Sequence, residues 1–203
     1  MKLIGNYTSP YVRKISVIML EKGITFEFVN ESPWHDESHV PQYNPLGKVP
    51  ALVVQPDEVW YDSSLIAEYL DQLDIAPALL PPDRLASLKV RQIEVLADGV
   101  CDAALVIVRN QMLPPEQQSQ SEVLRQRNKI QRGLDALEKH AAQGEWLNGE
   151  RLTLADIATA CTIGYLNFRR VVPNWCVERP SLVKLAEKMF QRESFARTVP
   201  PSA

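Results

Sequence analysis

Hydrophobic and polar positions follow two different periods along this chain, and the change falls near residue 80. In the first part, short β-branched or alternating runs predict strands at 2–7, 26–29, 51–54 and 58–60. Between them, Val12, Ile15, Ile18 and Met19 recur at helical spacing, and a second helical pattern runs from 63 to about 73. The segment 31–43 is polar and is expected to be a loop with one helical turn. This order of elements predicts an α/β unit.

A proline-rich stretch at 76–83 separates this part from a second one that is helical throughout. Pro77, Pro81 and Pro82 cannot continue a helix. The pattern then predicts long amphipathic helices at about 83–112 and up to about 142, with Leu124 on an inward face. A very apolar helix at 153–168 and a last helix at 181–191 follow. We therefore expect one domain at 1–76, a linker at 77–82 and an all-helical domain at 83–203.

Three helix starts carry polar residues suited to capping. Ser9 precedes Pro10, a proline suited to the first helical position, and Asp62 and Ser63 precede the helix at 63–73. Thr153 and Asp156 have the spacing of a capping box, which we interpret as structural rather than catalytic. A helix N-terminus also attracts carboxylates. The first two starts are thus candidate anion sites, with ordinary capping as the alternative.

The turn at 44–50 leads directly into the strand predicted at 51–54. Pro50 stands where a strand begins, a position that tolerates proline, and the Val49–Pro50 bond can be cis at little cost. A cis bond would turn the backbone N–H and C=O of Val49 outward, where they can pair with an extended peptide. An ordinary turn before a strand is the alternative interpretation.

Taken together, these stretches resemble the glutathione-binding half of the glutathione S-transferases. The resemblance rests on Asn-Pro-x-Gly-x-Val-Pro at 44–50, on Asp-Ser-x-x-Ile at 62–66 and on Ser9-Pro10 upstream. It extends over nearly the whole chain and is closest to small bacterial glutathione-transferase-like proteins. It implies a thioredoxin-like α/β domain followed by an all-helical domain.

The same resemblance implies a function, with glutathione as co-substrate. We expect the protein to transfer reduced glutathione to a small electrophile, or to act as a weak glutathione-dependent peroxidase. The alternative is a glutathione-binding or regulatory protein with the same fold and little catalysis. The resemblance further implies a homodimer.

Ser9 is the expected catalytic residue. Only the thiolate of glutathione reacts, and a hydroxyl donor at a helix N-terminus stabilises a thiolate. Tyr7 is the alternative, because some classes of the family use a tyrosine at the end of the first strand. Cysteine-type relatives carry cysteine in the slot of Ser9, and the first domain has none. Arg13, one turn further on, is either an aid to ionising the thiol or a solvated surface residue.

Other positions are expected to bind the peptide itself. The main chain of Val49 is expected to pair with the extended tripeptide, and Asp62 and Ser63 are expected to bind the γ-glutamyl amine and carboxylate. The glycyl carboxylate is expected to meet Lys48 and His35. The family more often has glutamate where this chain has Asp62.

Composition and charge exclude several other classes of protein. A net charge of -3 argues against nucleic-acid binding. No apolar run approaches the roughly 20 residues that span a bilayer, and the N-terminus lacks a signal-peptide core, so we expect no membrane partner and a cytoplasmic location. The three cysteines and three histidines show no metal-site spacing, and Cys101 and Cys161 are expected to be buried.

A polar stripe on the first long helix is the remaining candidate feature. Asp98, Asp102, Val106 and Arg109 recur at helical spacing, which indicates a wet cleft, a subunit interface or simply a solvated edge. In a dimer, Asp98 or Asp102 would reach the γ-glutamyl amine of the neighbouring subunit's glutathione. Tyr165 and Trp175 are candidates to line an electrophile pocket.

Overall fold

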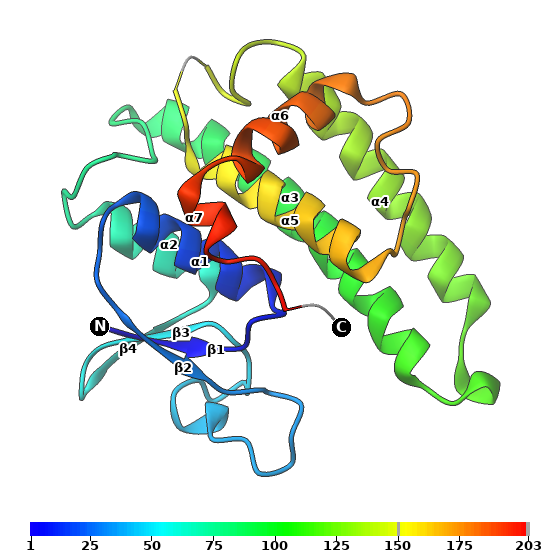
Figure 1. Cartoon of the computed structure of the whole chain (residues 1–203), viewed down its shortest axis with the longest axis horizontal. Helices are drawn as coiled ribbons and strands as arrows, with labels where there is room; N and C mark the ends of the chain where they lie inside the picture. Colours follow the sequence, from blue (N-terminus) through cyan, green and yellow to red (C-terminus); the bar gives the residue numbers. More distant parts are fainter. Residues whose placement is uncertain (150, 202–203) are drawn as a thin grey trace. The chain divides into compact units, whose positions relative to one another are not determined.

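The computed structural model describes residues 1–149 and 151–201, which form two compact units (Figure 1). The first unit comprises residues 1–79 together with the described residues from Gln191 onward, and the second comprises Leu80–Phe190. The predicted fold, a thioredoxin-like α/β domain followed by an all-helical domain, is confirmed. The expected boundaries had placed everything after residue 82 in the helical domain, whereas the contacts group 191–201 with the first unit. Residues 202–203 lie outside the described part.

The first unit contains a four-stranded sheet in the order β2-β1-β3-β4. Strand β1 pairs parallel with β2 and antiparallel with β3, and β3 pairs antiparallel with β4. The parallel pair requires a crossover, which α1 supplies. The elements are β1 (Lys2–Gly5), α1 (Pro10–Glu21), β2 (Glu27–Asn30), the short helix η1 (Val40–Gln42), β3 (Ala51–Gln55), β4 (Glu58–Tyr61) and α2 (Ser63–Asp71).

Helices α1 and α2 lie on one face of this sheet (Figure 1). Their apolar stripes form the core with the central strands, and Leu3, Ile18, Leu52 and Ile66 are fully buried. Gly5 allows α1 to approach β1, because a Cβ there would lie 2.4 Å from Cγ2 of Val12. The first helix is therefore held tightly against the strand that precedes the candidate site.

The C-terminal segment completes the first unit. Helix α7 (Glu193–Ala196) packs on α1 and buries Phe195. At the C-terminal end of α1, the buried ammonium of Lys22 donates to Asp71 Oδ1 at 2.8 Å and to the carbonyls of Ile75 and Pro77 at 2.9 and 2.8 Å. This buried ion pair fixes the end of α1 to the end of α2.

The second unit is a bundle in which α3 packs against both α4 and α5 (Figure 1). Helix α5 begins with the predicted capping box: Asp156 Oδ2 accepts from the N–H and the hydroxyl of Thr153, each at 2.8 Å. Leu124, predicted to face inward, is exposed because the buried face of α4 is formed by other positions. The elements are α3 (Arg84–Met112), the short helix η2 (Pro115–Gln117), α4 (Gln120–Ala141), α5 (Leu154–Arg169) and α6 (Pro180–Phe190).

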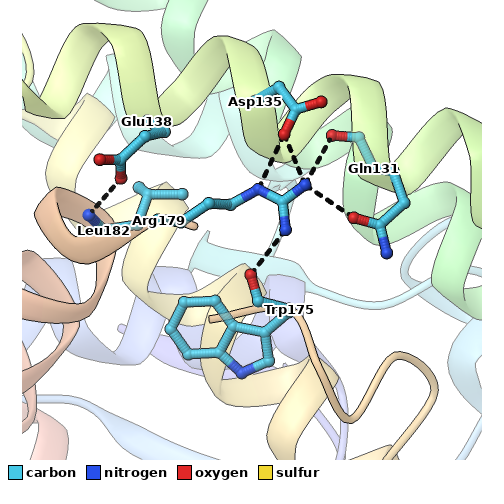
Figure 2. Close-up of polar contacts among 6 residues, drawn as sticks. All are labelled: Gln131, Asp135, Glu138, Trp175, Arg179 and Leu182. Atoms are coloured by element: carbon cyan, nitrogen blue, oxygen red, sulfur yellow. Dashed lines mark hydrogen bonds and ion pairs between the residues drawn. The ribbon is translucent and has the colours of Figure 1, made fainter. Parts of the chain in front are cut away.

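Arg179, almost entirely buried, joins the loop before α6 to α4 (Figure 2). Its guanidinium donates to Asp135 Oδ1 at 3.0 Å through Nε, to Gln131 Oε1 at 2.7 Å and to the carbonyl of Trp175 at 2.8 Å. The carboxylate of Glu138 then accepts from the N–H groups of Ser181 and Leu182 at the start of α6. These contacts order the loop before α6 together with the buried side chains of Val171, Val172 and Trp175.

Candidate functional site

Strand register brings three of the predicted site segments to one end of the sheet. Ile4 pairs with Ala51, so the end of β1, which leads to Ser9, lies beside the start of β3, which follows Val49. Ala51 in turn pairs with Tyr61, so Asp62 and Ser63 emerge at the same end. The segments of Ser9, Val49 and Asp62 therefore meet at one edge of the first unit.

Ser9 is the N-cap of α1, as predicted, and it is half-buried. Its Oγ accepts a hydrogen bond from the N–H of Val12 at 3.3 Å. A hydroxyl that accepts in this way keeps its own hydrogen to donate. The site thus presents an O–H donor at the positive end of a helix, a suitable arrangement for stabilising an anion such as a thiolate.

Tyr7 has a different environment. The residue is 55% exposed, and its ring stacks on Phe28 of β2 with centroids 4.7 Å apart. It lies before the helix rather than at its N-cap. Ser9 is therefore the better placed of the two candidates with respect to the helix N-terminus.

The buried side chain of Asn44 organises the turn that leads to Val49. Its Nδ2 donates to the carbonyl of Lys48 at 2.9 Å, and its Oδ1 accepts from the N–H of Leu46 at 3.0 Å. The Val49–Pro50 peptide bond is cis, and Val49 lies two residues before β3 begins. Lys48 is exposed.

Asp62 is the N-cap of α2, as predicted, and Oδ1 accepts from the N–H groups of Ser64 and Leu65 at 2.9 and 3.4 Å. Its φ of 70° is a conformation that residues other than glycine rarely adopt, at a cost of about 1–3 kcal/mol. Such strain concentrates at functional sites. Ser63 follows as the first, buried residue of the helix.

His35 lies in the loop that follows β2. It is exposed in a turn in which its carbonyl accepts from the N–H of Ser38 at 3.0 Å. Strand β2 pairs in parallel with β1, with Asn30 opposite Gly5, so this loop also leaves the sheet at the end where β1 leads to Ser9. The strand register thus brings the segments of Ser9, Val49, Asp62 and Ser63 together, and a contact of His35 with a bound peptide stays a prediction.

Arg13 is not the solvated surface residue that one interpretation proposed, since it is only 8% exposed. Its Nη2 donates to the carbonyl of Phe195 and its Nε to Oγ1 of Thr198, both at 3.3 Å. The guanidinium also lies over the ring of Phe195, 5.2 Å from its centroid. Its contacts thus bind the C-terminal segment to α1, a function that the sequence pattern did not reveal.

In the second unit, Asp98 and Val106 are half-buried on α3, whereas Asp102 and Arg109 are exposed. Tyr165 and Trp175 are buried, and burial raises the pKa of Tyr165. Cys101 and Cys161 are buried as predicted, and desolvation raises the pKa of the Cys101 thiol well above its usual value, which makes it a poor nucleophile.

Within residues 1–149 and 151–201, no three His, Cys, Asp or Glu side chains form a group that would hold a metal ion. In the same part of the chain, no helix is both long and apolar enough to cross a membrane.

Comparison with known families gives two matches. Residues 8–73 match the model of the glutathione S-transferase N-terminal domain, and residues 96–193 match that of the glutathione S-transferase C-terminal domain. Over 203 residues the chain is 60% identical to the uncharacterized GST-like protein YibF of Escherichia coli K12, with all of both chains covered.

Solved structures give the same result. A glutathione S-transferase from Methylobacillus flagellatus KT with glutathione bound is 38% identical, with a TM-score of 0.94 over 98% of this chain and 99% of that one. A glutathione transferase family member from Pseudomonas fluorescens Pf-5 with bound S-(propanoic acid)-glutathione is 33% identical, with a TM-score of 0.82 over 99% of this chain and 100% of that one.

Proposed function

Because the chain belongs to the glutathione S-transferase family, we propose that it binds reduced glutathione and transfers it to a small electrophile. The observation that carries this proposal is the meeting of a helix-capping serine, the Val49 turn and the Asp62 cap at one end of the sheet. The similar proteins with bound glutathione and a bound glutathione conjugate support it.

Each segment of the site would meet a different part of the tripeptide. The main chain of Val49 would pair with the backbone of the cysteinyl unit, and Ser63 at the start of α2 would bind the γ-glutamyl carboxylate. Asp62 Oδ1 is engaged in capping, which leaves Oδ2 of this carboxylate for the γ-glutamyl amine. Lys48 and His35, both exposed, would supply positive or hydrogen-bonding groups for the glycyl carboxylate.

The proposed reaction is addition or displacement by the glutathione thiolate. Ser9 would donate its O–H to the sulfur, which favours the thiolate over the thiol and holds it in place. The sulfur then forms a bond to the electrophilic carbon, and the electron pair moves to the acceptor atom or leaves with the displaced group. A serine cannot form a mixed disulfide, so conjugation, or a weak peroxidase reaction, is expected rather than thioltransferase activity.

Calorimetric titration with reduced glutathione tests the binding step. Asp62→Asn keeps an oxygen that can cap α2 but removes the charge, so we expect glutathione affinity to fall about tenfold while the fold is retained. Glu68→Gln, on a later turn of α2, is the matched control. The absence of binding by the folded parent at millimolar glutathione would refute the proposal.

A screen of common electrophiles and peroxides separates catalysis from binding alone. A rate above the uncatalysed reaction that is lost in Ser9→Ala supports the transferase. The alternative, a glutathione-binding or regulatory protein, predicts intact glutathione binding with no turnover of any tested compound.

We also propose that the protein is a homodimer. Leu85, Leu88 and Val95 form an exposed apolar stripe on α3, with 62%, 62% and 63% of each residue accessible. Exposed apolar stripes of this kind mark protein interfaces. Light scattering tests the proposal: the parent is expected to have twice the monomer mass of 22.9 kDa. Leu88→Glu is expected to shift it toward the monomer, and a monomeric parent would contradict the proposal.

A further inference from the structure

Within the second unit, α3 and α4 are joined by a turn that extends beyond the end of α5 (Figure 1). The turn is ordered by its own hydrogen bonds. Oδ1 of the buried Asn110 accepts from the N–H of Ser119 at 2.8 Å, and Nε2 of Gln118 donates to the carbonyl of Leu113 at 2.8 Å. Every residue from 111 to 117 is exposed. The end of this helical hairpin is therefore both fixed and accessible.

Three apolar side chains at this end of the hairpin are in contact with water. Met112 closes α3, Leu113 follows it, and Leu124 lies in the second turn of α4, with 71%, 43% and 61% of each residue accessible. These three residues form the apolar tip. Apolar side chains that gather on an exposed surface mark a site of contact with protein or membrane. The stripe proposed for the dimer lies in the first half of α3 and is a different surface.

The exposed side of α4 carries a row of positive charges. Its four members recur at intervals of four, three and seven residues, which places them on one side of the helix, and each of them is exposed. At 1.5 Å per residue the row is about 21 Å long. This basic stripe consists of Arg125, Lys129, Arg132 and Lys139.

The acidic side chains of α4 offset only the first member of the stripe. Glu122 accepts from Nε and Nη2 of Arg125, each at 2.8 Å. Asp135 is paired with Arg179 of the loop before α6, and Glu138 accepts from N–H groups at the start of α6. In the part of the chain that the structure describes, the other three members of the stripe form no ion pair. The stripe thus keeps positive charge, although the whole chain has a net charge of -3.

We propose that this end of the hairpin binds the surface of an anionic lipid bilayer. The apolar tip enters the boundary between headgroups and acyl chains, and the basic stripe faces the anionic headgroups. Binding of this kind draws on buried apolar area and on electrostatic attraction together, and clusters of four or more basic residues on a helix suit anionic lipids. With only three apolar side chains and four basic ones, the association is expected to be reversible.

This attachment needs no helix that crosses the bilayer, so it agrees with the lack of such a helix in the described part of the chain. It departs from the expectation of no membrane partner, which rested on the lack of an apolar run of spanning length. It also goes beyond the proposed transfer of glutathione, since every residue assigned to glutathione belongs to the first unit.

Nucleic acid is the other polyanion that the stripe could meet, and the sequence of this region disfavours it. Residues 111–132 contain no aromatic side chain on which a base could stack. An electrostatic contact with phosphates would also leave the apolar tip exposed to water. The tip and the stripe together therefore favour lipid.

The test is cosedimentation of the full chain with vesicles of phosphatidylcholine alone or of phosphatidylcholine and phosphatidylglycerol in equal parts. We expect binding to the anionic vesicles to be at least about tenfold tighter, and to be lost in about 0.5 M NaCl. The double variant Lys129→Gln with Arg132→Gln should weaken binding to anionic vesicles at least about tenfold. Its control, Lys2→Gln with Lys184→Gln, removes two exposed cations outside the stripe and should bind as the parent does.

The apolar tip is tested separately. Met112→Ser with Leu124→Ser should weaken binding to anionic vesicles about fivefold. Val177→Ser with Val199→Ser, which changes two exposed apolar residues elsewhere, should have no effect on it. Circular dichroism checks that each variant is folded.

Three results would overturn the proposal. The first is equal binding of the parent to both kinds of vesicle, or binding to neither. The second is a stripe variant or a tip variant that is folded and binds anionic vesicles as tightly as the parent. The third is tighter binding of a labelled single-stranded oligonucleotide than of anionic vesicles, lost in the stripe variant, which would assign the stripe to nucleic acid. A protein that cosediments as described but does not bind glutathione would refute the proposed function alone.

Discussion

Arg192 and Glu21 form a two-point ion pair in which Nε and Nη2 of the guanidinium each donate to a different carboxylate oxygen at 2.7 Å. The hydroxyl of Ser194 donates to the same carboxylate. This pair joins the last part of the chain to the end of α1. It also explains why the segment after residue 190 groups with the first unit rather than with the helices that precede it in sequence.

The first prediction concerns the pH dependence of this pair. The hydrogen bonds from Arg192 lower the pKa of Glu21 below its ordinary value of 4.5, despite the opposing effect of burial. A lowered pKa in the folded state gives stability that is present above the pKa of the unfolded chain and is lost as pH falls through that of the folded protein. Glu21→Gln should therefore lower the free energy of unfolding by about 1–2 kcal/mol at pH 7 and by progressively less below pH 4.5.

Urea unfolding at a series of pH values would measure this difference in the free energy of unfolding. Glu193→Gln, which alters an exposed glutamate of the same segment, should have little effect at any pH. A cost of Glu21→Gln that stays constant from neutral to acid pH would show that the carboxylate charge is not its source.

The second prediction distinguishes Ser9 from Tyr7. Removing one hydrogen-bond donor from a reacting anion typically lowers turnover by about a hundredfold, and we expect this of kcat/KM in Ser9→Ala. Ser9→Thr keeps the hydroxyl and the cap and should retain most of the activity. Tyr7→Phe should remain close to the parent. The reverse order, with Tyr7→Phe inactive and Ser9→Ala active, would reassign the thiolate donor.

The third prediction concerns Asn44. Asn44→Ala removes the hydrogen bonds to Lys48 and Leu46 from a buried position, and we expect a loss of about 1–3 kcal/mol in stability together with weaker glutathione binding. Gln42→Ala, at an exposed position of η1, serves as the control. Thermal unfolding and calorimetry would measure the two effects. If the Asn44→Ala variant is destabilised but binds glutathione with unchanged affinity, the turn does not contribute to glutathione binding.

The fourth prediction concerns the loop before α6. Arg179→Met leaves the Trp175 carbonyl and Gln131 without their charged donor, and we expect about 2–4 kcal/mol of destabilisation (Figure 2). Arg170→Met, in the same loop region, is the comparison. Hydrogen exchange should show faster exchange at residues 171–180 in Arg179→Met. Equal exchange in both variants would mean that Arg179 does not order the loop.

The sequence predicted the helices in which the apolar pattern extends over many residues. Helix α3 begins at Arg84, close to the predicted start at about 83, and α5 begins with the predicted capping box. Ser9 and Asp62 cap α1 and α2 as expected. Local capping chemistry and periodicity determine these features, so they can be inferred from neighbouring residues alone.

Features that depend on distant contacts were not predicted. Helix α7 is too short to show a period, and its placement on α1 depends on Phe195 and on ion pairing across about 170 residues of sequence. In the sequence, Lys22 does not differ from an ordinary basic residue at a helix end, although its ammonium group is buried in the structure. The positive φ of Asp62 likewise arises from the strand-to-helix turn and not from any local pattern.

Because the C-terminal segment packs on α1, the first unit cannot be completed until the end of the chain has been synthesised. Domains generally fold as they emerge from the ribosome, the N-terminal one first. Here α1 emerges early, whereas Phe195, which packs on it, is added only after all of the helical unit has been synthesised. Until then the flank of α1 that contacts Phe195 stays open to water, and the nascent first unit presents an apolar surface that chaperones can recognise.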